Sequence, residues 1–140
     1  MTGQRVVDIR FEGVVDYQAA LEQMRELQTL RIDDKIDDTL LLMEHPEIVT
    51  VGPRARNDGI KAPPGYPTFP VDRGGGLTWH GPGQIVCYPI FKWDLPDEDS
   101  VTSIIAKLED WVIKSLTTLA IPARKDDLSL IHISEPTRQP

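Results

Sequence analysis

Apolar residues near the start of the chain first alternate and then recur at helical spacing. They occupy every second position from Val7 to Phe11, which predicts a strand over residues 6–11. Asp16 is a suitable N-cap for a helix that continues to about Arg31. The helical spacing gathers an apolar stripe on one face of this helix, and we expect the stripe to be core. The stripe consists of Tyr17, Ala20, Leu21, Met24, Leu27 and Leu30.

The middle of the chain alternates apolar runs with polar segments. The run TLLLMEH at 39–45 is typical of a strand covered on both faces, and IVTVG at 48–52 predicts a second, shorter strand. The acidic segment 33–38 favours a solvated loop. The segment 54–67, rich in Gly, Pro and Arg, favours an exposed loop, which is a common place for functional residues.

Two more strands and a helix complete the pattern. Residues 77–80 and 85–91 predict strands, and the GPGQ between them favours a tight hairpin. Asp99 or Ser100 caps a helix that runs to Leu119, and its apolar face is expected to pack on a sheet. No internal repeat is present, so the pattern predicts an α+β fold, a mixed α/β sandwich, instead of a repeating βαβ array. The apolar face comprises Val101, Ile104, Ile105, Leu108, Trp111, Val112, Leu116 and Leu119.

Composition narrows the functional classes. The chain has 140 residues, of which 40% are hydrophobic, so we expect one domain at most, with a real core. A formal charge of -7 argues against a general binder of nucleic acid or anionic membranes. The charged first thirty residues, the single cysteine and the lack of a long apolar run predict a soluble, cytoplasmic protein without an internal disulfide.

The stretch 71–91 concentrates glycine beside a histidine. Gly74, Gly75 and Gly76 leave main-chain amides free of side chains, so the amides could face an anion or a carbonyl oxygen, and Arg73 could hold a carboxylate or phosphate. The spacing matches neither the Walker motif nor the dinucleotide fingerprint. Without further signals, a flexible loop or a bulge explains such a triplet equally well.

The stretch RGGGLTWHGPGQIVCYPI, at 73–90, resembles the signature of the octanoyltransferases of lipoate biosynthesis. LLLMEHPEIVTVGPRA at 40–55 and the helix at 100–119 followed by IPAR resemble neighbouring elements of that family in the same order. The similarity covers about residues 5–127. Trp79, where Tyr is usual, and Pro53, after the Thr-x-Gly segment, depart from the family pattern while keeping the local shape.

The resemblance implies a truncated lipoate/biotin ligase-like catalytic domain. It also implies transfer of an octanoyl group from acyl carrier protein to a lysine of lipoyl domains, in 2-oxoacid dehydrogenases and the glycine cleavage protein, through a cysteine thioester and without a cofactor. In that picture His80 closes the acyl pocket near the reacting atoms. The pocket is lined by Arg73, Gly74, Gly75, Gly76, Leu77, Thr78, Trp79 and His80.

The expected nucleophile is missing from this pattern. Cys87 lies within an apolar strand, where a free cysteine usually behaves as a small buried hydrophobe. The family's cysteine and lysine are expected beyond residue 127, so no residue here is assigned a catalytic role and this chain is expected to be inactive. The chain's own Lys107, Lys114 and Lys125 match no such context.

The end of the chain has two interpretations. Residues 128–138 resemble the translation of a transposase adapter used for sequencing libraries, which would make 1–127 the N-terminal part of an octanoyltransferase-like domain and 128–140 a non-native tail. Alternatively, residues 128–133 form a genuine edge strand.

The sequence leaves two other functions open. The chain could be a noncatalytic module that binds an acyl or lipoyl group, or an adenylating lipoate or biotin ligase, although those ligases usually place Asp after the histidine. His45 favours a hydrogen-bonding role, and no metal is predicted because no second ligand has usable spacing. Acyl carrier protein is acidic, so Arg54, Arg56 and Lys61 are the candidates for docking it.

Overall fold

The computed structural model describes residues 5–72, 75–125 and 131–133. The chain divides into two compact units, one of residues 4–92 and one of residues 93–140 with residues 1–3. Both helices and strands are present, and the strands pair in parallel and antiparallel fashion. The predicted α+β class is therefore confirmed.

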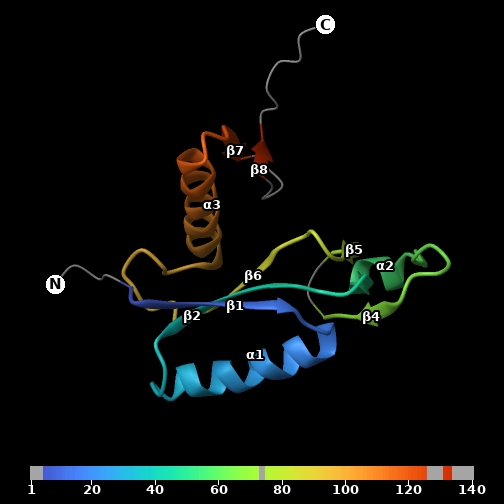
Figure 1. Ribbon diagram of the computed structural model, residues 1–140, viewed down its shortest axis with the longest axis horizontal. Helices are drawn as coiled ribbons and strands as arrows, with labels where there is room; N and C mark the ends of the chain where they lie inside the picture. Colours follow the sequence, from blue (N-terminus) through green and yellow to red (C-terminus); the bar gives the residue numbers. More distant parts are fainter. Residues whose placement is uncertain (1–4, 73–74, 126–130, 134–140) are drawn as a thin grey trace, which may run out of the picture. The chain divides into compact units, whose positions relative to one another are not determined.

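The first sheet of the larger unit has the strand order β1-β2-β6. β1 (Val7–Val14) runs parallel to β2 (Asp38–Glu44), and β2 runs antiparallel to β6 (Val86–Ile90). Helix α1 (Tyr17–Ile32) connects the two parallel strands and lies along one face of this sheet (Figure 1). The strand predicted at 6–11 is confirmed and continues to Val14.

The core of this unit forms between α1 and β2. The Asp16 carboxylate accepts a hydrogen bond from the Ala19 N–H at 3.2 Å, which confirms the predicted N-cap. Ala20 and Leu27 pack against Leu41 and Met43. The apolar stripe of α1 is thus core over most of its length, whereas Leu30 in the last turn is exposed.

The second sheet has the strand order β4-β3-β5. β3 (Ile48–Val51) runs parallel to β4 (Thr68–Pro70) and antiparallel to β5 (Leu77–His80). A short helix, α2 (Pro53–Asn57), follows β3, so the segment predicted as a continuous loop begins with a helical turn. Proline at the first helical position lacks the N–H that would have no partner there, which favours this start.

The predicted hairpin between residues 77–80 and 85–91 is wrong. β5 pairs with β3, whereas β6 pairs with β2, so the two strands belong to different sheets. The GPG segment bends the chain without reversing it: the Gln84 N–H donates to the Gly81 carbonyl at 3.1 Å, and Gly83 has a φ of 92°. Residues 77–90 consequently run beside residues 38–51 as one bent antiparallel ribbon.

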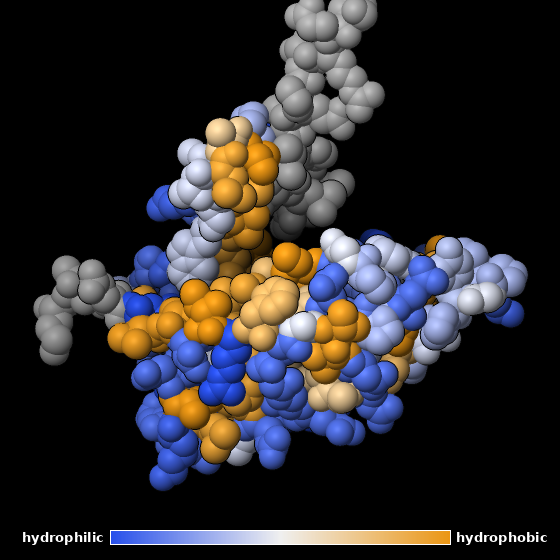
Figure 2. Space-filling view, in the orientation of Figure 1, coloured by the Kyte–Doolittle hydropathy of each residue, from blue (hydrophilic) through white to orange (hydrophobic). Residues whose placement is uncertain are grey.

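The smaller unit contains α3 (Val101–Thr118) and an antiparallel pair, β7 (Ala123–Lys125) and β8 (Ile131–Ile133). The Ser100 hydroxyl accepts from the Ser103 N–H at 3.0 Å, so the predicted helix and cap are confirmed. No residue of α3 is buried, and an apolar surface runs along it (Figure 2). Its packing on a sheet stays a prediction.

β8 agrees with the interpretation of residues 128–133 as an edge strand, while the origin of the tail stays a prediction. The segments 126–130 and 134–140 lie outside the described residues. Across the part of the chain that the structure describes, no helix combines the length and apolar character needed to cross a bilayer.

Asp38, at the start of the central strand β2, anchors one end of the first sheet. Its side chain is almost fully buried and accepts hydrogen bonds from Arg31 Nε at 2.5 Å, from the Lys92 N–H at 2.8 Å and from Arg5. Burial alone would raise the pKa of Asp38, but these donors outweigh it and hold the pKa below its ordinary value. The prediction of a solvated loop over 33–38 is therefore wrong at Asp38, which is buried at the start of β2.

Replacing this carboxylate tests the anchor. Asp38→Asn leaves two arginines without their shared charge partner, so we expect a loss of about 3 kcal/mol of unfolding free energy near neutral pH. The folded-state pKa is lowered, so the carboxylate's contribution is present above the unfolded pKa and disappears as the pH falls through the folded value. The difference between the two proteins in urea unfolding should accordingly shrink in acid.

Asp37→Asn is the matched control, because Asp37 is an exposed neighbour in the same acidic segment. It should leave the urea midpoint nearly unchanged at neutral pH. Equal losses for both variants would contradict the anchoring role.

Candidate functional site

The glycine loop is the triplet at 74–76, and its described residues, Gly75 and Gly76, pack their main chain directly on the main chain at the end of β3. The Gly52 N–H donates to the Gly76 carbonyl at 2.9 Å, and a Cβ on Gly52 would lie 2.3 Å from the Gly75 carbonyl oxygen. Gly75 has a φ of 113°, a conformation that favours glycine. Arg73 and Gly74, which belong to the predicted acyl pocket, lie outside the described residues. Glycine at position 52 thus lets the loop approach β3.

The rest of the predicted pocket lies on β5, whose side chains alternate between two faces. Thr78 and His80 share one face, and Leu77 and Trp79 share the other. Trp79 is 43% exposed, and its Nε1–H donates to Glu47 Oε2 at 3.0 Å. The residues predicted to line a single pocket are therefore divided by the geometry of the strand, and only one set lies beside His80.

His80 belongs to a cluster of five rings, of which four lie on α1, β4, β5 and β6 and the fifth, His45, directly follows β2. Tyr17 is stacked on it with centroids 5.9 Å apart and an interplanar angle of 19°, and His45 meets it edge-on at 5.9 Å. Tyr17 also contacts Phe69 at 5.1 Å, and His45 contacts Tyr88 at 5.9 Å. We call these five residues the aromatic cluster; it lies where β2, β4, β5, β6 and the start of α1 meet.

The sequence patterns missed this cluster for two reasons. Tyr17 was assigned to the apolar stripe of α1, and Phe69 followed a segment predicted as loop. Only the pairing of β3 with both β4 and β5 brings Phe69 and His80 to the same sheet. A tyrosine at the first helical turn and an aromatic residue near a Pro-rich loop carry no such signal.

His45 is fully buried and has both ring nitrogens hydrogen-bonded. Nδ1 lies 2.7 Å from the Val15 carbonyl oxygen, and Nε2 lies 2.8 Å from the Tyr88 hydroxyl. Because a carbonyl oxygen only accepts, Nδ1 carries the proton and Nε2 accepts from Tyr88. The predicted hydrogen-bonding role of His45 is confirmed. Within the described residues, no three His, Cys, Asp or Glu side chains gather as metal ligands would.

The two arginines predicted to dock a carrier protein have different surroundings. Arg54 Nη2 lies 3.8 Å from the position that a Cβ on Gly76 would take, so its charge is beside the glycine loop. Arg56 Nη1 donates to the carbonyl oxygens of Val51 at 2.7 Å and Val71 at 3.0 Å, which fixes its guanidinium against the second sheet.

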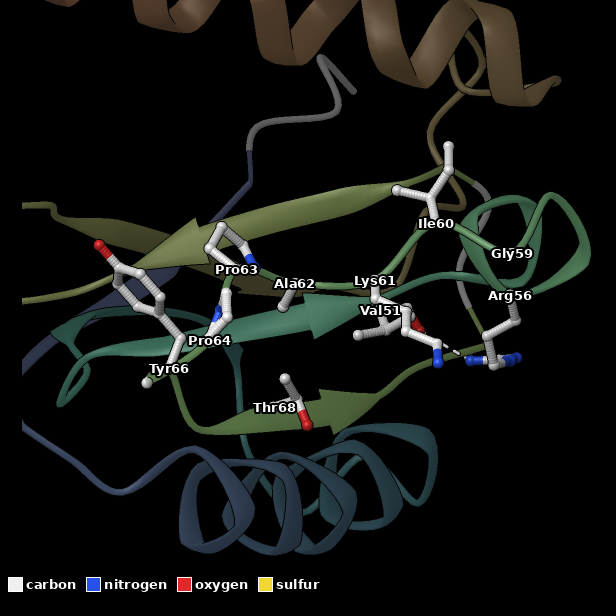
Figure 3. Close-up of a pocket in the computed structure, with 11 residues that line it drawn as sticks. Val51, Arg56, Gly59, Ile60, Lys61, Ala62, Pro63, Pro64, Tyr66 and Thr68 are labelled. Atoms are coloured by element: carbon white, nitrogen blue, oxygen red, sulfur yellow. Dashed lines mark hydrogen bonds between the residues drawn. The ribbon is translucent and has the colours of Figure 1, made fainter.

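A separate open groove of about 550 Å³ lies between β3, β4 and the segment that joins α2 to β4. Arg56 and Lys61 lie at one end of it, and Pro63, Pro64 and Tyr66 lie toward the other (Figure 3). None of the described pocket residues 75–80 lines this groove. The groove thus has a cationic end and an apolar end, and it is separate from the glycine loop.

The single cysteine differs from its prediction. Cys87 is exposed on β6 and was predicted to be buried. Among the strands that the structure describes, β6 pairs with β2 alone and so lies at an edge of its sheet. Desolvation by the surrounding chain still raises the pKa of the Cys87 thiol, which favours the protonated form and makes it a poor nucleophile.

A model of the lipoyl protein ligase A/B catalytic domain matches residues 16–135 of the chain. The chain belongs to this family. The resemblance predicted from the glycine-rich stretch is thereby confirmed.

Named relatives agree with this assignment. The chain is 39% identical over 115 residues to an octanoyltransferase of Corynebacterium glutamicum and 42% identical over 111 residues to one of Acidothermus cellulolyticus. These matches cover 82% and 79% of the chain, but 45% and 49% of the two relatives. The chain thus spans about half the length of the relatives that it matches, which are acyl-transferring enzymes.

Solved structures share the fold at low sequence identity. The chain matches protein Ta0514, a putative lipoate protein ligase from T. acidophilum, with a TM-score of 0.54 at 17% identity, covering 92% of this chain and 53% of the other. A lipoate-protein ligase A bound with ATP matches with a TM-score of 0.54 at 16% identity, covering 96% and 53%. These likenesses confirm the ligase-like fold.

The contact between Gly52 and the glycine loop yields a prediction. Gly52→Ala would place a methyl group against main-chain atoms that have no rotamer to change, so we expect a loss of about 1–3 kcal/mol in unfolding free energy. Gly76→Ala is the matched control, because its Cβ would meet only Arg54 at an ordinary 3.8 Å. Thermal unfolding should show a clear drop for the first variant and a small one for the second; the reverse order would contradict the packing.

Proposed function

We propose that the protein to which this chain belongs transfers an octanoyl group from acyl carrier protein to a lysine of lipoyl domains, through a cysteine thioester on the enzyme. The observation that carries this proposal is the glycine loop, held against Gly52, at the start of the strand that ends in His80. The octanoyltransferases of about 40% identity support the choice of acyl group.

The residues present in this chain account for one part of the proposed chemistry, the binding of the acyl group. The glycine loop supplies main-chain groups without side chains, and amides of that kind stabilise a developing oxyanion by roughly 3 kcal/mol per well-placed donor. His80, inside the aromatic cluster, supplies a ring nitrogen at the end of the strand that follows the loop. In this proposal residues 73–80 hold the acyl group, and the cysteine and lysine of the reaction come from the part of the relatives that this chain does not span.

Cys87 does not fill the role of the nucleophile. An acyl-accepting thiol needs a lowered pKa, and the pKa of Cys87 is raised by desolvation. This supports the expectation that the 140-residue chain lacks transfer activity by itself. Residues 128–140 are proposed to be a non-native tail that follows an octanoyltransferase-like segment of residues 1–127.

Transfer assays test the missing nucleophile. With octanoyl-acyl carrier protein and a lipoyl domain, the 140-residue chain should give no product above the background rate, and Cys87→Ser should leave that result unchanged. Robust turnover that Cys87→Ser abolishes would contradict the proposal.

Ligand binding tests the acyl site directly. An octanoyl-pantetheine thioester added to the ¹⁵N-labelled chain should shift the amide resonances of residues 75–80, because the acyl carbonyl lies against them. The acetyl thioester is the matched control and should bind more weakly, since each buried methylene contributes about 0.8 kcal/mol. Shifts confined to the groove beside Lys61 would contradict this assignment.

The groove offers a docking place for the carrier. Acyl carrier protein is acidic while this chain has a formal charge of -7, so we propose that contact uses the local cations at Arg56 and Lys61. Because Arg56 is held by main-chain carbonyls, Lys61 is the better residue to change.

Charge reversal tests the docking place. Lys61→Glu should weaken binding of acyl carrier protein about fivefold at low salt, as expected for roughly 1 kcal/mol of surface electrostatics. The measurement is a titration at two salt concentrations, and the effect should diminish at the higher one. Lys35→Glu, the same change at an exposed site in the acidic segment, is the control. Equal weakening by both variants would show an effect of net charge alone.

A further inference from the structure

Gln84 holds one nitrogen of His80 through a hydrogen-bond pair with a fixed direction. Gln84 Nε2 lies 3.2 Å from the Trp79 carbonyl oxygen, and Gln84 Oε1 lies 2.8 Å from His80 Nδ1. A carbonyl oxygen only accepts, so the amide nitrogen of Gln84 must face Trp79 and its oxygen must face His80. An amide oxygen also only accepts. Nδ1 of His80 is therefore the protonated nitrogen.

The bend after β5 brings Gln84 back to His80. The Gln84 N–H donates to the Gly81 carbonyl at 3.1 Å, and the Gly83 N–H donates to Glu44 Oε1 at 2.6 Å. Gly83 has a φ of 92°, which a side chain would strain. The sequence HGPGQ thus places the side-chain amide of Gln84 against the ring of His80.

The ring plane of His80 is fixed as well. Tyr17 is stacked against one side of it and His45 meets it edge-on, so rotation of the ring would break both contacts. With Nδ1 protonated, the neutral ring carries its lone pair on Nε2. Among residues 5–72 and 75–125, none makes a hydrogen bond to His80 Nε2.

The two histidines of the aromatic cluster therefore differ in how many of their ring nitrogens are hydrogen-bonded to described residues. His45 uses both nitrogens inside the protein, one to Val15 and one to Tyr88, and serves as a rigid support. Within the described residues, His80 uses only Nδ1, and Nε2 is left as an acceptor for a ligand.

We propose that Gln84 is a positioning residue that fixes the Nδ1–H tautomer of His80, so that Nε2 accepts a hydrogen bond from the N–H of the amine that attacks the acyl group. The role assigned to Nε2 rests on the proposed function; the tautomer rests on the hydrogen bonds alone. No bond is made or broken in this step, and the amine keeps its proton while it is oriented.

Nitrogen NMR of the 140-residue chain tests this tautomer without any acyl ligand. Long-range ¹H–¹⁵N spectra distinguish a protonated from an unprotonated ring nitrogen, and neutral His80 should show a protonated Nδ1 and an unprotonated Nε2. In Gln84→Leu the acceptor is lost, so the Nε2–H form, which free histidine prefers, should become the major one. Gln84→Glu keeps an oxygen in place and should keep the Nδ1–H form.

Gln28→Leu, the same change at an exposed position of α1, is the control and should leave His80 unchanged. The resonances of His45 are an internal reference, because its tautomer is fixed by Val15 and should persist in every folded variant. If Gln84→Leu does not fold, the wild-type and Gln84→Glu spectra still decide. An Nε2–H tautomer in the wild type, or an unchanged tautomer in folded Gln84→Leu, would overturn the proposal.

The outcome is separable from the proposed function. A confirmed tautomer with no binding of the octanoyl thioester would leave the role of Gln84 in place and reject the acyl site. Binding of the thioester with the opposite tautomer would reject the role of Gln84 and leave the acyl site in place.

Discussion

The arrangement of the larger unit depends on one continuous main-chain pairing, that of residues 38–51 with residues 77–90. The pairing spans two sheets and bends where residues 44–47 face residues 81–85. The segment 81–85 is one residue longer than the segment opposite it. At that corner the ladder is interrupted, and Glu44 bonds the Gly83 N–H in its place. His45, His80 and Tyr88 come together because of this bend, and the glycine loop follows at the far end of the same ribbon.

The structure separates cations that hold the fold from cations that face solvent. Arg5 and Arg31 both donate to the Asp38 carboxylate, and several donors together offset the cost of burying its charge. Arg56, although exposed, donates to two main-chain carbonyls, that of Val51 in β3 and that of Val71 directly after β4. The number of basic residues in the sequence is therefore larger than the number available to bind an acidic partner. Arg54, beside Gly76, and Lys61, at the groove, lie near the two places that are proposed to bind a ligand.

The site itself relies on preorganisation more than on charge. Main chain packed on main chain fixes the glycine loop, and stacked rings and an amide fix His80. Such a site is proposed to hold a neutral acyl group and to direct hydrogen bonds to it, while the covalent step is proposed to use groups from the part of the relatives that this chain does not span. The exposed Cys87, with its raised pKa, is consistent with that division.

The sequence by itself determined the local elements: the capped helices, the strand at 39–45 and the family signature around His80. Caps and periodicity depend on neighbours a few residues apart, which a sequence displays. It could not determine that residues 77–80 and 85–91 pair with different partners, because glycine and proline specify a change of direction without specifying a partner strand. The burial of Asp38, the exposure of Cys87 and the meeting of Tyr17, Phe69 and His80 were decided by tertiary structure, since each depends on contacts between segments far apart in the chain.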